Sequence, residues 1–152
     1  MGRNRKIAIA ADHRGFGLKE KIARFLKSKR IPVIDFGAHS EDPCDYPDTI
    51  LKAAEAVRRK RASRAIGICH SGIGSAIAAN KVKGVRAALV QNAEQAKLSR
   101  AHNDSNMLIL GSGFVSASTA KKIITRWLKT PFEGGRHARR IGKITRYERR
   151  ND

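Results

Sequence analysis

Aromatic and acidic residues are scarce in this sequence. One tryptophan, two tyrosines and five phenylalanines occur among 152 residues, and none is interleaved with the basic clusters. Proteins that bind single-stranded nucleic acids usually stack bases on such aromatic side chains, so their scarcity argues against that function. The 13 acidic residues stand against 32 lysines and arginines, which gives a formal net charge of +19. This charge attracts anionic substrates and polyanions, and it leaves nucleic acid open as a disfavoured partner.

Cysteine is almost absent as well. Cys44 and Cys69 are 25 positions apart and neither belongs to a CxxC pair. A disulfide framework and a zinc site are therefore both disfavoured. We expect no metal and no cofactor, and any chemistry of these residues would have to come from a lone thiol.

Long apolar runs are also missing. No stretch approaches the roughly 18 to 20 apolar residues that a membrane-spanning helix needs. The first apolar stretch, residues 7–11, is interrupted by Asp12 and His13 and is too short for the core of a signal peptide. These absences predict a cytoplasmic protein with no membrane partner.

Short apolar runs alternate along the chain with segments of helical periodicity. The runs predict strands at 6–11, 32–36, 65–69, 87–90 and 107–110, and the periodic segments predict helices at 18–29, 49–60, 74–81, 93–102 and 116–129. Strands that read as continuous apolar runs, each followed by a helix, are typical of a parallel sheet covered on both faces. We therefore predict an α/β fold: a three-layer αβα sandwich with a five-stranded parallel Rossmann/flavodoxin-like sheet.

The C-terminal segment differs from the rest of the chain. Thr130-Pro131 ends the last predicted helix, Gly134-Gly135 forms a flexible joint, and residues 136–150 are rich in arginine and lysine. This basic C-terminal extension is either a solvated tail or an arm that carries guanidinium groups to an anion. We predict a single domain over residues 1–152, with a core at about 6–130 and an arm at 131–152.

Candidate catalytic residues follow the first and third predicted strands. In a flavodoxin-like sheet, ligands bind at the carboxyl ends of the strands, at the switch point between strands one and three. Asp12-His13 ends the first strand, and residues 69–74 (Cys-His-Ser-Gly-Ile-Gly) end the third. A glycine-rich loop of this kind presents backbone N–H groups to negative charge, and an adjacent helix N-terminus favours a cysteine thiolate. The pattern predicts one crevice that contains a carboxylate, an imidazole and a thiol.

Several ordered motifs, spread over residues 6–143, resemble the ribose-5-phosphate isomerase B family, which includes allose- and galactose-6-phosphate isomerases. They are Asp12 to Phe16, Asp35 to Gly37, Asp45 to Asp48, Cys69 to Gly74, Ala78 to Lys81, His102 to Asp104 and Pro131 to His137. The resemblance implies metal-free aldose–ketose isomerisation through an enediolate. Ribose 5-phosphate and ribulose 5-phosphate are the favoured pair. A 6-phosphohexose, or a polyanion-binding protein on this scaffold, is the alternative.

The resemblance also implies a role for each catalytic residue. His102 with Asp12 would help to open the sugar ring, and Cys69 as thiolate would take the proton from C2. Ser71 would relay the proton between the two oxygens. The N–H groups of residues 70–74 would hold the enediolate oxygen.

Substrate-binding residues carried over from the resemblance lie in both halves of the chain. Asn103 would orient the sugar, while His13, Arg136 and Arg140 would hold the phosphate. Tyr46 is open to two interpretations, pocket lining or packing. The complete predicted set is His13, Tyr46, His70, Gly72, Ile73, Gly74, Asn103, Arg136, His137 and Arg140.

The sequence departs from the family pattern at three positions. Ser75 stands where a second branch of the family uses a glutamate as base, so Cys69 must act alone. His70-Ser71 stands where the family usually has Gly-Thr, and Gly113 where it often has an arginine that helps to bind phosphate. Cys44 matches no catalytic element.

The resemblance implies a homodimer, or a tetramer built from dimers, with shared active sites. His102-Asn103 follows the fourth predicted helix, away from the crevice between strands one and three, and the basic arm is likewise detached from the sheet. Both reach an active site most easily across a two-fold interface.

Overall fold

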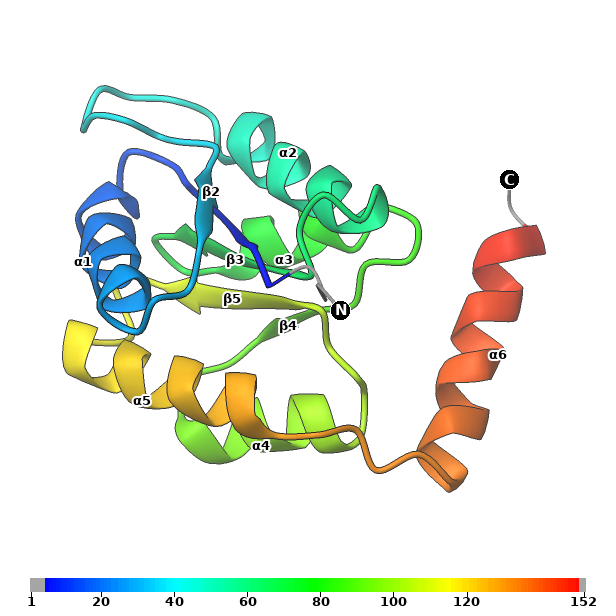
Figure 1. Cartoon of the computed structure of the whole chain (residues 1–152). Coiled ribbons are helices and arrows are strands. Elements are labelled where there is room, and N and C mark those ends of the chain that lie inside the picture. The colour runs from blue at the N-terminus through cyan, green and yellow to red at the C-terminus, as the bar shows by residue number, and fades with distance from the viewer. Residues whose placement is uncertain (1–4, 151–152) are drawn as a thin grey trace.

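The computed structural model describes residues 5–150, and it contains a parallel sheet flanked by helices (Figure 1). The strands are β1 (Ile7–Ala11), β2 (Val33–Asp35), β3 (Arg64–Cys69), β4 (Ala87–Leu89) and β5 (Met107–Gly111). The helices are α1 (Phe16–Ser28), α2 (Tyr46–Arg58), α3 (Ile73–Ala79), α4 (Ala93–Ala101), α5 (Ala117–Lys129) and α6 (Arg136–Arg150). Every predicted strand and helix is confirmed to within a few residues. The predicted domain limits 1–152 include residues 1–4 and 151–152, which lie outside the described part.

The strand order is β2-β1-β3-β5-β4, with all neighbours parallel. The predicted switch point between β1 and β3 is present, but beyond β3 the last two strands are exchanged relative to the flavodoxin order. Burial explains the exchange. All five residues of β5 are buried, whereas the three-residue strands β2 and β4 are partly exposed and occupy the edges.

Alternate side chains of each strand enter two separate apolar cores. One core packs α1, α4 and α5 on one face through buried residues such as Ile22, Ile123 and Trp127. The other core packs α2 on the opposite face, with Ile50 against Ala10 and Ile109. Figure 1 shows α4 and α5 below the sheet and α2 above it. The period-two alternation of strand side chains thus produces the three predicted layers.

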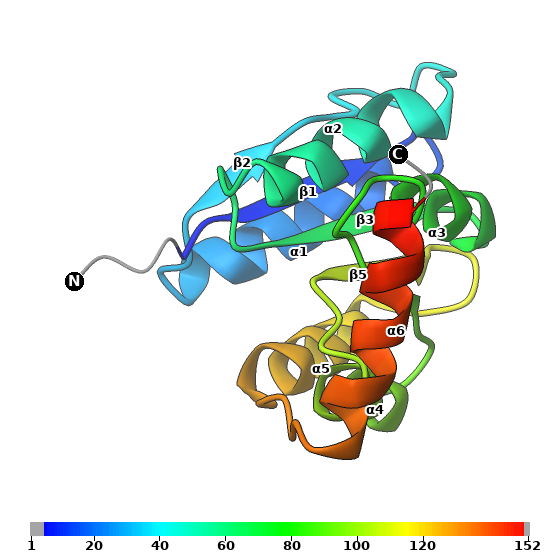
Figure 2. The ribbon, with the colours of Figure 1, turned by 90° about the vertical axis from the view of Figure 1, so that its right-hand side faces the viewer.

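The basic C-terminal segment forms a helix, α6, that stands apart from the sheet. Gly134 and Gly135 adopt φ values of 70° and 58°, left-handed conformations that favour glycine, and they turn the chain after α5. Glu148 Oε1 accepts a hydrogen bond of 3.0 Å from the Gly84 amide. Figures 1 and 2 show α6 on the side of the molecule opposite the loops that follow β1, β3 and β5. Residues 5–150 include no helix long and apolar enough to cross a membrane.

Candidate active site

Asp12 and Cys69 lie next to each other at the carboxyl ends of β1 and β3. Ala11 pairs with Ile68, and the Asp12 amide still donates to the Ile68 carbonyl at 3.3 Å, so Asp12 and Cys69 follow at the same level of adjacent strands. Both are buried, with exposed fractions of 6% and 5%. Asp12 Oδ1 accepts hydrogen bonds from the amides of Arg14 at 3.0 Å and Gly15 at 2.9 Å. A fixed carboxylate and a thiol therefore lie side by side at the carboxyl ends of β1 and β3, where the sequence predicts the crevice.

The loop that follows β3 is hydrogen-bonded to the loop that follows β5. Ser112 N donates to the Cys69 carbonyl at 2.9 Å, and Gly113 N donates to the His70 carbonyl at 3.0 Å. Gly72 has a φ of 79°, which lets the chain turn sharply into α3. Ser71 Oγ accepts a 3.1 Å hydrogen bond from the Ile73 amide, so that one of the N–H groups expected to face the enediolate is engaged within the loop.

Gly111 tests how tightly this loop is held. A Cβ atom at Gly111 would lie 2.6 Å from the Ser71 carbonyl oxygen and 3.0 Å from that of His70, both backbone atoms. Gly111→Ala is therefore expected to displace the loop, destabilise the fold by about 1 to 3 kcal/mol and lower turnover. Thermal unfolding and steady-state kinetics measure both effects. The matched control for stability is Gly17→Ala in α1, where nothing lies within 4 Å of the added Cβ. An equal loss of thermal stability in both variants would contradict the steric explanation.

His13 is positioned by the backbone of Cys44. Its Nδ1 lies 3.2 Å from both the amide nitrogen and the carbonyl oxygen of Cys44. When Nδ1 accepts from the amide, the ring proton lies on Nε2, the nitrogen that remains available to a ligand. This contact could not be predicted from the sequence, because backbone atoms of any residue type could make it.

Tyr46 begins α2 and leans over the loop after β3. A Cβ at Gly74 would lie 2.5 Å from Tyr46 Cζ, so the phenol ring packs directly on the Gly74 backbone. Its exposed fraction is 36%. The structure therefore shows that Tyr46 packs on this loop, and its role in lining a substrate pocket stays a prediction.

Ser75 occupies the place of the glutamate used by the second branch of the family. It is fully buried in α3, and within residues 5–150 its hydroxyl has no hydrogen-bond partner. A buried serine hydroxyl is far too weakly acidic to replace a carboxylate base at neutral pH. The structure thus leaves Cys69 as the thiol base candidate of this crevice.

A cleft of about 780 Å³ opens beside the crevice. It is lined by His13, Arg14, Gly17, Leu18, Lys21, Glu41, His70, Ser112, Gly113, Val115, Ser116 and Ala117. Sequence reasoning missed Arg14 and Glu41 as lining residues, although Arg14 lies inside a quoted motif. A larger cleft of about 850 Å³, mainly between α1 and α5, is lined by apolar, lysine, arginine and threonine side chains, with no thiol, histidine or carboxylate among its lining residues.

A second cluster contains His102, Glu133 and His137. The two imidazole rings stack with centroids 4.2 Å apart and planes 9° apart. Glu133 Oε2 lies 3.5 Å from His137 Nε2 and 4.0 Å from His102 Nε2. Burial, and then the positive charge of His102, lower the pKa of His137 below its usual value.

The ligand atoms of these three side chains all lie within 4.8 Å of one another, close enough to consider a metal ion. The nearly parallel rings, however, direct their nitrogen lone pairs side by side rather than towards one point. One ion could not bind both histidines without a ring rotation, so the geometry fits a stacked pair sharing a carboxylate better than a metal centre.

The loop that carries His102 and Asn103 is held by two arginines. Arg86 Nε donates to the Asn103 carbonyl at 3.1 Å, and Arg100 Nη1 donates to the Ser105 carbonyl at 2.6 Å. Asp104, with a φ of 47°, pairs with Arg100 at 2.8 Å. The Glu133 amide donates to the Ala101 carbonyl at 3.0 Å, which fixes the start of the C-terminal arm beside His102.

Within one chain, the residues at the carboxyl ends of β1 and β3 and the cluster of His102, Glu133 and His137 lie at opposite edges of the sheet. α4 starts beyond the carboxyl end of β4 and runs back across the sheet, so His102 lies at the edge where the strands begin. Asp12, His13, Tyr46 and residues 69–74 lie at the edge where the strands end. Five predicted site residues lie away from them. They are His102 and Asn103 at the end of α4, and Arg136, His137 and Arg140 on α6, which lies on the side opposite the carboxyl ends of the strands (Figure 1).

Comparison with known proteins identifies the family. A family model described as Ribose/Galactose Isomerase matches residues 7–144. The chain belongs to the ribose/galactose isomerase family. The resemblance seen in its motifs is thereby confirmed over nearly all of the described residues.

Relatives within the ribose/galactose isomerase family match along their whole length. Ribose-5-phosphate isomerase B of Escherichia coli (strain K12) is 42% identical over 148 residues, covering 97% of this chain and 99% of the relative. A structure of ribose-5-phosphate isomerase B from Clostridium thermocellum has a TM-score of 0.95 and 50% identity, covering 97% of this chain and 99% of that one. Ribose-5-phosphate isomerase B from Mycoplasma genitalium, solved with bound ribulose-5-phosphate, has a TM-score of 0.91 and 46% identity, covering 95% and 96%.

Proposed function

We propose that this protein is an aldose–ketose isomerase that interconverts ribose 5-phosphate and ribulose 5-phosphate. The observation that carries the proposal is the placement of Cys69 beside Asp12 at the β1/β3 switch point of a ribose/galactose isomerase fold. A solved relative holds ribulose-5-phosphate, which supports a pentose phosphate as the substrate.

The reaction moves one proton from C2 to C1 and another from O2 to O1, and it shifts the carbonyl double bond from C1 to C2. After Asp12 and His102 assist opening of the sugar ring, the Cys69 thiolate removes the proton from C2 and leaves an enediolate. The same proton returns to C1, while Ser71 passes a proton between the O1 and O2 atoms. No atom is gained or lost, and no oxidant is needed. Phosphate binding by His13, Arg136 and Arg140 positions the two reacting carbons and contributes remote binding energy.

The site is completed by a second copy of the chain. The positions of the predicted site residues support this arrangement, because His102, Asn103 and Arg136 lie at the opposite edge of the sheet from Cys69. A two-fold dimer places the arm of each subunit at the crevice of its partner. Residues 6–130 then form the catalytic core, and residues 131–152 the arm that serves the partner.

Exposed apolar side chains support such an interface. Ile73 and Ile77 on α3 are 57% and 59% exposed, and Ile144 and Tyr147 on α6 are 57% and 71% exposed. Apolar residues at i and i+4 share one side of a helix, so α3 presents a pair beside the active-site loop. Burying these side chains against a second copy would remove apolar area from water and stabilise the dimer.

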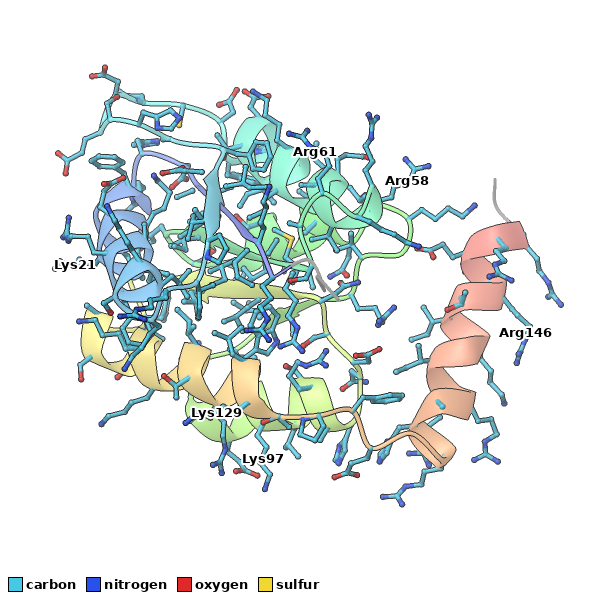
Figure 3. All side chains as sticks on the ribbon, in the orientation of Figure 1. Lys21, Arg58, Arg61, Lys97, Lys129 and Arg146 are labelled. Atoms are coloured by element: carbon cyan, nitrogen blue, oxygen red, sulfur yellow. The ribbon has the colours of Figure 1, made fainter. Side chains whose placement is uncertain are left out.

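The strongly basic composition supports attraction of a phosphorylated substrate more than a nucleic-acid surface. Figure 3 shows the labelled side chains Lys21, Arg58, Arg61, Lys97, Lys129 and Arg146 spread around the molecule, so that the positive charge extends well beyond the basic helix α6. A nucleic-acid-binding protein concentrates its basic residues in one patch or stripe. Two free thiols and a sugar-phosphate substrate also support a cytoplasmic enzyme of the pentose phosphate pathway.

A substrate panel tests the function. Turnover of ribose 5-phosphate, allose 6-phosphate and galactose 6-phosphate is measured beside salt-dependent binding of RNA. We expect the highest kcat/KM with ribose 5-phosphate and weak RNA binding that disappears at physiological salt. Preferential turnover of a hexose phosphate would correct the substrate. RNA binding that persists at high salt, without turnover of any of the three sugar phosphates, would contradict the proposal that the protein is an isomerase.

A further inference from the structure

His70 and Gly113 fit together as a pair. A Cβ atom at Gly113 would lie 2.4 Å from Cε1 of His70, 2.8 Å from Nδ1 and 2.9 Å from Nε2. The imidazole therefore fills the space in which any side chain at position 113 would begin. The two loops are also joined by the 3.0 Å hydrogen bond from the Gly113 amide to the His70 carbonyl. The two departures from the family pattern are thus one structural feature: a ring on the β3 loop replaces a side chain on the β5 loop.

The ring lines the cleft beside the active site. His13 and Arg14 line the same cleft from the loop after β1, and Ser116 and Ala117 line it at the start of α5. Lys21 and Glu41 are the other charged residues around it. Ser112 Oγ donates to the Arg14 carbonyl at 3.0 Å, which ties the walls from β1 and β5 together. His70 is exposed, and its ring meets Phe114 at 6.1 Å between centroids, so its nitrogens are accessible to a ligand.

The charges of this cleft favour an anion. Arg14 and Lys21 carry two positive charges against the single carboxylate of Glu41, and the two histidines add ring N–H donors. α5 is 13 residues long, and its first turn lies at this wall, which adds partial positive charge. Histidine can donate to a phosphate oxygen in its neutral and charged forms, and more strongly when charged.

We propose that His70 binds the phosphate group of the substrate in this cleft, in place of a side chain from position 113, and that Gly113 is required because it makes room for the ring. The proposal rests on the proposed function for the identity of the substrate. It assigns the phosphate a ligand that lies between Cys69, the last residue of β3, and Ser71 in the loop that follows. Binding of the phosphate is thereby coupled directly to the position of the catalytic loop.

The test compares four variants in their affinity for inorganic phosphate, measured by calorimetry and as the competitive inhibition constant. His70→Ala is expected to weaken phosphate binding about tenfold, as loss of a hydrogen bond to a charged group implies. Gly113→Ala, which keeps His70 but displaces its ring, should weaken binding in the same direction. The double variant His70→Ala/Gly113→Arg should regain most of the affinity, because a guanidinium can then enter the vacated space. Lys129→Ala, at the far end of α5, should match the parent.

The two readouts separate this proposal from the proposed function. If the parent fails to isomerise ribose 5-phosphate, calorimetry with inorganic phosphate still tests the role of His70. If His70→Ala binds phosphate as tightly as the parent, His70 is not a ligand and the proposal is wrong. The same holds if the double variant binds no better than His70→Ala while circular dichroism shows both folded. In the active enzyme, KM should rise more than kcat falls.

Discussion

Cys69→Ser is expected to reduce turnover of ribose 5-phosphate by about a hundredfold to ten-thousandfold, the usual contribution of a positioned general base. The serine hydroxyl is nearly the size of the thiol but far less acidic, so it cannot take the C2 proton at neutral pH. Because Cys69 is buried at the end of β3 and its carbonyl accepts from Ser112 N, the backbone of the variant should keep its place. Steady-state kinetics with circular dichroism as a check of folding measure the effect.

The matched control is Cys44→Ser. Cys44 touches the site through its backbone amide and carbonyl, which the substitution retains beside His13. This variant should therefore keep most of the parental activity. Near-normal turnover in folded Cys69→Ser would show that a thiol base at residue 69 does not drive the reaction. An equal loss in Cys44→Ser would show that the loss of turnover is not specific to residue 69.

Mixing inactive Cys69→Ala with inactive His102→Ala subunits is expected to restore about a quarter of parental activity. In the shared-site dimer, a heterodimer contains one site with both substitutions and one site with neither. Random exchange gives about half heterodimers, each with one of its two sites intact, which yields the quarter. The positions of the two residues at opposite edges of the sheet are the physical reason to expect recovery.

The control for this experiment mixes Cys69→Ala with Asp12→Ala. Both residues lie in the same crevice, 6% exposed or less, so every heterodimer would contain two damaged sites and no activity should return. Mass spectrometry of differently labelled subunits verifies the exchange. No recovery in the Cys69/His102 mixture after verified exchange would place His102 and Cys69 in one chain and overturn the shared site. Recovery in the control would instead show that Asp12 and Cys69 act from different chains.

The sequence alone was sufficient to predict the layers of the fold and the proximity of Asp12 and Cys69. Continuous apolar strands separated by amphipathic helices have few arrangements other than a covered parallel sheet, so Ile7–Ala11 and Arg64–Cys69 could be recognised from pattern. Because the carboxyl ends of parallel strands meet at one edge, Asp12 and Cys69 could be expected together. The family motifs added roles for His102, Asn103 and Arg136, and these roles stay predictions.

Only the tertiary structure decided how distant segments fit one another. Four features of the structure depend on contacts between residues that are distant in the sequence. They are the exchange of β4 and β5, the hydrogen bond between the Cys44 backbone and His13, the stacking of His102 on His137, and the packing of the His70 ring over Gly113. Periodicity reports which face of an element is buried, because that depends on neighbours along the chain. It does not report which two loops touch, because that depends on the summed packing of the whole sheet and its helices.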